Sequence, residues 1–205
     1  MSGATLHPVR RSPWRLFLLE PVTLVAFVVL LIVILSALLA PFLGLPNPVE
    51  GSLIDRLKPP GTPGHILGTD ALGRDLLSRL VWGGRVSLMV GFAAVGLAAL
   101  VGVTLGLVSG YVAGRFDFWV QRFIDVLMAF PYILLALIVV AILGPGLVNT
   151  MLAISIASIP YYVRIARGSA LSLRESEFVK AAQAAGAPLW WILTRHVLTN
   201  SLSPI

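Results

Sequence analysis

Pro21 to Leu43 have the sequence PVTLVAFVVLLIVILSALLAPFL, which is 23 residues without one charge. As an α-helix this run would be about 35 Å long, at 1.5 Å per residue. The hydrocarbon core of a bilayer is roughly 30 Å thick, so such a helix can cross it. The run is also far longer than the apolar part of a secretory signal, which has about 7–15 residues. We therefore expect a retained first span, preceded by a segment of residues 1–20 on the cytoplasmic side.

The whole chain is poor in charge. Of its 205 residues, 58% are hydrophobic and 12% are charged, whereas a soluble domain carries about 25% charged residues. So few charges cannot solvate a folded surface, and lipid must cover much of it. The net charge of +6 does not indicate nucleic-acid binding, because the Lys and Arg residues stand at the ends of apolar runs rather than in a basic patch. The chain has no cysteine, and its three scattered histidines form no metal-ligand pattern, so we expect no metal site.

Two more uncharged runs follow, residues 86–114 and 126–163. The second is too long for one crossing, and Gly144-Pro145-Gly146 divides it, because proline cannot continue the helical hydrogen-bond ladder. This gives four complete crossings. Residues 197–205 are too short to cross, and we expect them to begin a fifth span. The predicted fold is an all-α integral membrane protein, with residues 86–205 as its core.

The basic residues predict the orientation. Ten Lys and Arg residues fall on the side of the N-terminus, and five fall on the other side, in the loop of residues 44–85. Because cytoplasmic loops carry the excess of Lys and Arg, the N-terminus should be cytoplasmic and this loop extracytoplasmic.

Within the loop we expect a short amphipathic helix at the outer interface. Its apolar face would hold Leu72, Leu76, Leu77, Leu80 and Val81, and its polar face Arg74, Asp75, Ser78 and Arg79. Asp75 and Arg79 are four residues apart and can pair. The helix could simply lead into the second span, or it could dock an external partner.

Glycine recurs at every fourth position of the second span, at Gly102, Gly106, Gly110 and Gly114. In lipid, where hydrophobic association is weak, such a smooth face lets another helix approach closely and gain dispersion contacts. The spacing therefore predicts a helix-packing face.

The middle of every predicted span lacks charge. Asp125, three residues from Arg122, is expected to be the only carboxylate near a span, either as an interfacial ion pair or as a gate. A proton-coupled carrier would hold buried ionisable residues, so we expect the energy source to lie elsewhere. Residues of the third and fourth spans that could line a translocation path, or equally pack between helices, are Asp125, Pro131, Tyr132, Ser155, Ser158 and Tyr161.

Residues 172–199 are too polar to span and should lie in the cytoplasm. Ser172 to Glu175 match a capping box at a helix start. Gly186 suits the left-handed position after a helix end, and Pro188 suits the first turn of the next helix. One face of the first helix would carry Phe178, Ala181, Ala182 and Ala185. Alanines on an exposed face permit close approach by another protein, so this helix–turn–helix is expected to dock a partner.

EFVKAAQAAG (Glu177–Gly186), with RHVLTN (Arg195–Asn200) after it, resembles the EAA loop of binding-protein-dependent ABC permeases. HILGTDALGRD (His65–Asp75) and residues 79–91 look like the second permease subunit of dipeptide, oligopeptide and nickel importers. The similarity covers essentially the whole chain. It departs from the family pattern at Lys180, which occupies an acidic position, and at Thr199, where the family usually has proline.

The resemblance implies a type I ABC importer transmembrane-domain fold with six spans, so this sequence would be a fragment of such a subunit. It implies a location in the cytoplasmic (inner) membrane of a bacterium or archaeon. The implied partners, besides lipid, are a second homologous permease in a heterodimer, two ATPase subunits and an extracytoplasmic substrate-binding protein. ATP would be hydrolysed by those partners, so the chain itself would be no enzyme and would need no cofactor.

The resemblance also implies a function and a coupling site. The function would be a permease for di- or oligopeptides, or alternatively for nickel, glutathione or another small solute. An ion-coupled secondary carrier is the alternative from another class. The residues that would couple to the ATPases, in the segment 172–199, are Glu177, Phe178, Lys180, Ala181, Ala182, Ala185 and Gly186.

Overall fold

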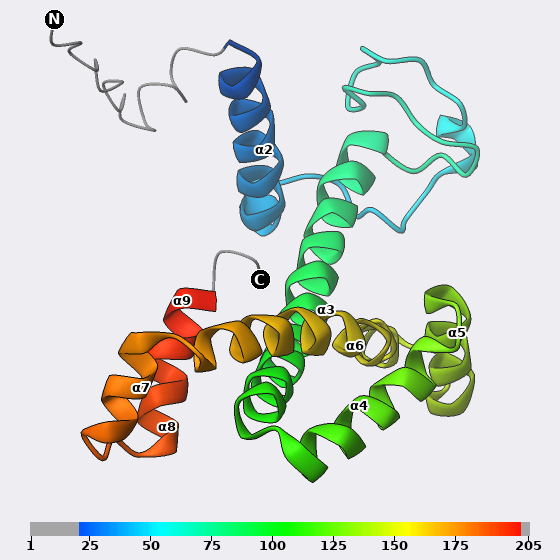
Figure 1. Cartoon of the computed structure of the whole chain (residues 1–205). Coiled ribbons are helices and arrows are strands. Elements are labelled where there is room, and N and C mark those ends of the chain that lie inside the picture. Colours follow the sequence, from blue (N-terminus) through cyan, green and yellow to red (C-terminus); the bar gives the residue numbers. More distant parts are fainter. Residues whose placement is uncertain (1–20, 202–205) are drawn as a thin grey trace, which may run out of the picture. The chain divides into compact units, whose positions relative to one another are not determined.

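The computed structural model describes residues 21–201, and every regular element in this range is a helix (Figure 1). The predicted N-terminal segment, residues 1–20, lies outside the described residues, as do residues 202–205. The chain divides into two compact units between Leu88 and Met89. The all-α fold class is confirmed for the described residues.

The first unit begins with an apolar helix. It consists of α2 (Pro21–Leu39) and the short 3₁₀ helix η1 (Ala40–Phe42), which together have 22 residues and are long and apolar enough to cross a membrane. This matches the predicted span of residues 21–43. Most of its large side chains are exposed, which suits a helix surrounded by lipid.

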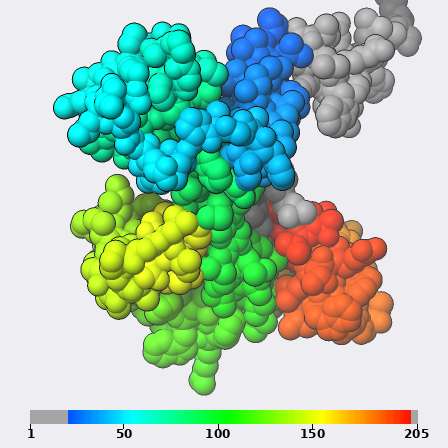
Figure 2. All heavy atoms as spheres, turned by 180° about the vertical axis from the view of Figure 1, so that it is seen from behind, coloured from blue at the N-terminus to red at the C-terminus, as the bar shows by residue number. Residues whose placement is uncertain are grey.

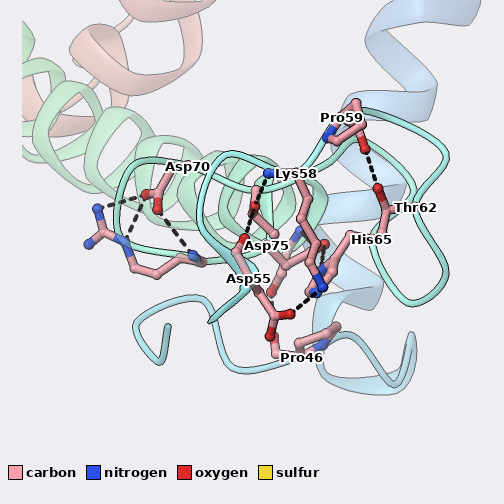
Figure 3. Close-up of polar contacts among 11 residues, drawn as sticks. Pro46, Asp55, Lys58, Pro59, Thr62, His65, Asp70 and Asp75 are labelled. Carbon is pink, nitrogen blue, oxygen red and sulfur yellow. Dashed lines mark hydrogen bonds and ion pairs between the residues drawn. The ribbon is translucent and has the colours of Figure 1, made fainter. Parts of the chain in front are cut away.

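Polar contacts hold together the loop that follows (Figure 3). Its centre is Asp70, which accepts hydrogen bonds from the backbone N–H groups of Leu72 and Arg74, at 2.8 and 3.0 Å. The same carboxylate pairs with the guanidinium groups of Arg74 and Arg79. Burial alone would raise the pKa of the Asp70 carboxyl, but the hydrogen bonds and the Arg74 charge outweigh it and hold that pKa well below its ordinary value.

The short amphipathic helix expected in this loop is not a separate element. One helix of 37 residues, α3 (Leu76–Val112), begins there and continues through the predicted second span. Asp75 caps it, because its Oδ2 accepts a hydrogen bond of 2.7 Å from the backbone N–H of Ser78. The predicted pairing of Asp75 with Arg79 is therefore wrong: Arg79 pairs with Asp70 instead.

The second unit contains the remainder of α3 and seven further described elements. These are α4 (Gly114–Met128), α5 (Tyr132–Leu143), α6 (Leu147–Arg174), α7 (Glu177–Ala184), α8 (Leu189–Trp191), the π-helical segment η3 (Ile192–Leu198), and the short α9 (Thr199–Ser201). The predicted break at Gly144-Pro145-Gly146 is confirmed, since α5 ends and α6 begins on either side of it.

A second break, which was not predicted, separates α4 from α5. Pro131 has no N–H to donate, and it disfavours helical backbone in the residue before it. The two helices are bent against each other by 91°. The sharp bend is visible in Figure 1. The third span expected from residue 126 onward is therefore not one straight helix.

The described helices include fewer candidate crossings than the expected four. Two helices in the described range, Pro21–Phe42 and Leu76–Val112, can cross a membrane by length and composition, and the bent pair α4–α5 could form a third. The predicted fourth span lies within α6, which has 28 residues but includes Asn149, Thr150 and several hydroxyl side chains. The predicted count of four spans is thus not confirmed.

We predict that Asp70→Asn loosens the loop. The asparagine keeps the shape but cannot pair with two guanidinium groups, so trypsin should cleave after Arg56 faster at neutral pH. Because folding lowers the pKa of the Asp70 carboxyl, the carboxylate stabilises the folded loop whenever the pH is above 3.8, the ordinary pKa of this group. This stabilisation is lost as the pH falls below 3.8 toward the lowered pKa. Glu50→Gln, at an exposed carboxylate, is the matched control. Equal cleavage rates for the two variants would contradict the role of Asp70.

Candidate functional site

The segment after α6 forms a helix with a well-defined end. α7 has eight residues, and Gly186 follows it with φ of 79°, in the left-handed position predicted from sequence. The backbone N–H of Ala187 donates to the Ala182 carbonyl at 3.0 Å, and that of Gly186 donates to the Gln183 carbonyl at 2.9 Å. This pair of bonds is the Schellman motif, which satisfies carbonyls at a helix end. The chain therefore turns sharply at Gly186 and enters α8.

One face of α7 is anchored to the helices around it. Val179 is fully buried in a cluster with Leu107 and Tyr111 of α3, with Ala166 and Ala170 of α6, and with Ile192 and Val197 of η3. Gln183 Nε2 also donates a hydrogen bond of 2.5 Å to the Tyr111 hydroxyl. A helix of this length is marginal alone, so these contacts are what hold it in place.

The opposite face of α7 is open. Phe178, Ala181 and Ala185 are exposed, together with Lys180. Ala182, which was expected on the same face, is half-buried against the cluster instead. In Figure 2 residues 175–201, in orange and red, form one lobe. Leu189 and Trp190 of α8 are exposed as well.

The start of the segment differs from the prediction. The capping box expected at Ser172–Glu175 does not form, because α6 continues to Arg174 and α7 begins only at Glu177. Ser172 is thus inside α6. Lys180, which departs from the family pattern, pairs with Glu175 at 3.3 Å, and both side chains are largely exposed.

Three of the four regularly spaced glycines lie against α6. A Cβ added to Gly102 would stand 2.6 Å from Tyr162 Cβ, one on Gly106 2.5 Å from the Val163 carbonyl oxygen, and one on Gly110 2.7 Å from the Arg167 carbonyl oxygen. No side chain fits at such distances. Gly114 does not share this face: it begins α4 with φ of 68°, and an added Cβ would meet nothing within 4 Å.

The residues expected to line a path fall into two groups. Tyr132 and Tyr161 line a recess of about 320 Å³, near the break between α4 and α5. The Tyr132 hydroxyl lies 3.3 Å from Ser158 Oγ, and Pro131 precedes the first turn of α5. Ser155, in contrast, is buried, and its hydroxyl donates to the Ala94 carbonyl of α3 at 3.0 Å. Ser155 therefore packs between helices and does not line the recess.

Asp125 forms an ion pair, but with a partner from another helix. Its Oδ1 lies 3.0 Å from Nη2 of Arg164 in α6, whereas Arg122 stacks over the Phe118 ring. Asp125 is not the only carboxylate here, because Asp117 of α4 is buried and paired with Arg167. Sequence spacing gave no signal for this pair or for the contact between Tyr111 and Gln183, since each joins residues far apart in the chain.

Comparisons with known proteins cover the part of the chain that holds this site. The family model described as binding-protein-dependent transport system inner membrane component matches residues 102–205. The chain is 42% identical over 198 residues to the dipeptide transport system permease protein DppC of Alkalihalophilus pseudofirmus, covering 95% of this chain and 65% of that protein. It is 40% identical over 186 residues to the probable D,D-dipeptide transport system permease protein DdpC of Escherichia coli, covering 91% and 62%.

A third relative is the glutathione transport system permease protein GsiD of Pectobacterium atrosepticum. The identity is 42% over 211 residues, covering 98% of this chain and 70% of that protein. The chain thus spans between 62% and 70% of the length of these three relatives.

We predict that Gly106→Leu disrupts the contact between α3 and α6. The side chain would collide with α6 backbone, and overpacking of this kind costs about 1–3 kcal/mol. Thermal unfolding in detergent should show a clearly lower midpoint. Gly96→Leu in the same helix is the matched control, because nothing lies within 4 Å of its Cβ position. If the two variants unfold at the same temperature, the glycine face does not stabilise the helix pair.

Proposed function

This chain belongs to the family of binding-protein-dependent transport system inner membrane components, and from that membership we propose that it is a permease subunit of an ATP-driven importer. It would form part of the translocation path in the cytoplasmic membrane of a bacterium or archaeon. Its partners would be a second, homologous permease, two ATPase subunits and an extracytoplasmic substrate-binding protein. ATP hydrolysis would be the work of the ATPase partners.

The observation that carries this proposal is the two-sided arrangement of α7. Val179 and Gln183 tie one side to α3, α6 and η3, while Phe178 and Ala181 stay exposed on the other. A short helix that is rigidly attached and open on one side can receive a partner and pass a displacement to the helices behind it. Small alanine side chains there let the partner's backbone come close.

The names of the relatives favour a di- or oligopeptide as the substrate class. Two of the names describe dipeptide transport and the third describes glutathione transport. The recess beside Tyr132 and Tyr161 is a candidate part of the path. Hydroxyl groups at Tyr132 and Ser158 could exchange hydrogen bonds with peptide groups in transit. Glutathione itself, nickel or another small solute is the alternative cargo within the same function.

The proposed orientation can be tested with single cysteines, because the chain has none of its own. Val49 lies in the loop between the first two spans and is 75% exposed, and Ser172 lies near the end of α6. The two test variants are Val49→Cys and Ser172→Cys. On intact cells an impermeant thiol reagent should label the first and spare the second. Labelling of Ser172→Cys alone would reverse the orientation and remove α7 from the side where ATP is available.

The coupling role of the segment after α6 can be tested at Gly186. In the complete transporter, Gly186→Arg should preserve membrane insertion and substrate capture by the binding protein, yet abolish ATPase association and ATP-driven uptake. Positive φ costs a residue with a side chain on the order of 1 kcal/mol, and arginine adds bulk and charge beside the exposed face.

Gly186→Ala separates these effects. Alanine meets the same backbone cost, but its Cβ would meet nothing within 4 Å, so uptake should fall only slightly. Normal uptake by Gly186→Arg, with expression confirmed, would falsify the assignment of this segment as the coupling site.

A further inference from the structure

An ion pair joins α4 to α6 within the second unit. Arg167 Nε donates to Asp117 Oδ1 at 2.7 Å, and Arg167 Nη2 donates to Asp117 Oδ2 at 2.6 Å, so the contact is bidentate. Asp117 is only 8% exposed. A second pair, Asp125 with Arg164, lies two turns further along α4 and is half-exposed. Bidentate pairing fixes both the distance and the relative rotation of the groups it joins.

Stability alone gives little reason for such a pair. Desolvation of two charges offsets most of their attraction, and apolar residues of similar volume often stabilise a fold at least as well. Apolar residues do not fix the relative orientation of two helices, because dispersion contacts are still made after one helix rotates against the other. The pair at Asp117 therefore sets the position of α4 on α6.

Arg167 also stands close to the site at α7. Gly110 of α3 lies against the Arg167 carbonyl oxygen. The next residue of α3, Tyr111, accepts a hydrogen bond from Gln183 of α7. The backbone of Arg167 thus touches the helix that anchors α7, while its side chain holds α4. Three contacts therefore link α7 to α4, namely Gln183 with Tyr111, Gly110 with the Arg167 carbonyl oxygen, and Arg167 with Asp117.

Breaks at both ends leave α4 able to move as a rigid rod. Ala113 precedes α4 with φ of 57°, Gly114 begins it with φ of 68°, and the bend before Pro131 follows it. The recess with Tyr132 and Tyr161 opens at that bend and is lined by Leu127 and Met128 of α4. A displacement of α4 must change the shape of this recess.

We propose that Asp117 and Arg167 are positioning residues that transmit movement of α7 to α4 and so couple ATP hydrolysis to the recess. The inference rests on the proposed function and deepens it. It assigns the coupling to one ion pair between two helices, outside the segment that receives the ATPase.

The test measures transport per ATP in proteoliposomes that contain the complete transporter, with a radiolabelled dipeptide as substrate. Asp117→Asn keeps the volume of the side chain but removes its charge. ATPase association and hydrolysis should persist, while dipeptide transported per ATP should fall roughly 2- to 30-fold, the range found for coupling residues. Asp55→Asn, which removes a partly buried pair with Lys58 in the loop of the first unit, is the matched control and should leave the ratio unchanged.

A double-mutant cycle excludes a merely structural role. Arg167→Gln should lower the ratio like Asp117→Asn, the two together should lower it no further, and exchange of the charges by Asp117→Arg with Arg167→Asp should restore most of it. The proposal is overturned if Asp117→Asn leaves the ratio unchanged, or if hydrolysis and uptake fall in parallel with loss of the ATPase. A wild-type complex that hydrolyses ATP but takes up no dipeptide would overturn the proposed function, and the coupling pair with it.

Discussion

The close approach of α3 to α6 determines how the second unit is built. A Cβ on Gly106 would lie 2.5 Å from the Val163 carbonyl oxygen, so the two backbones touch without side chains between them. In lipid the hydrophobic effect does not drive helices together, and dispersion over a close contact takes its place. Because this contact fixes where α6 leaves α3, it also brings Ala166 and Ala170 against Tyr111 and forms the surface on which α7 rests.

The candidate coupling helix depends on that surface. Its eight residues are too few to form a stable helix alone, and Val179 and Gln183 are its attachments to α3 and its neighbours. The residues that would meet a partner contribute little to this attachment, so the exposed face can be shaped for docking without weakening the fold. Lys180 illustrates this freedom, since its pair with Glu175 is exposed, and exposed pairs contribute little to stability.

Features that depend on neighbours along the chain were predictable from sequence. The run from Pro21, the break at Gly144-Pro145-Gly146 and the turn at Gly186 each follow from a local rule, and each is found. Predictions failed where a longer helix overrode a local signal. The capping box at Ser172 does not form, because α6 continues past that residue. The contacts that spacing could not predict join residues 39 to 72 positions apart, as Asp125 with Arg164, Asp117 with Arg167, Ser155 with the Ala94 carbonyl, and Tyr111 with Gln183 do.

The two faces of α4 show why directional contacts matter in this environment. Its apolar face, with Phe116, Trp119 and Phe123, lines a recess of about 500 Å³ together with residues of α3 and α6. Apolar side chains bordering such a space resist sliding or rotation only weakly, since one set of dispersion contacts replaces another. The polar face is different, because a rotation would separate Asp117 from Arg167 and leave a buried carboxylate without its guanidinium partner. One face thus permits movement of α4, and the other makes that movement follow α6.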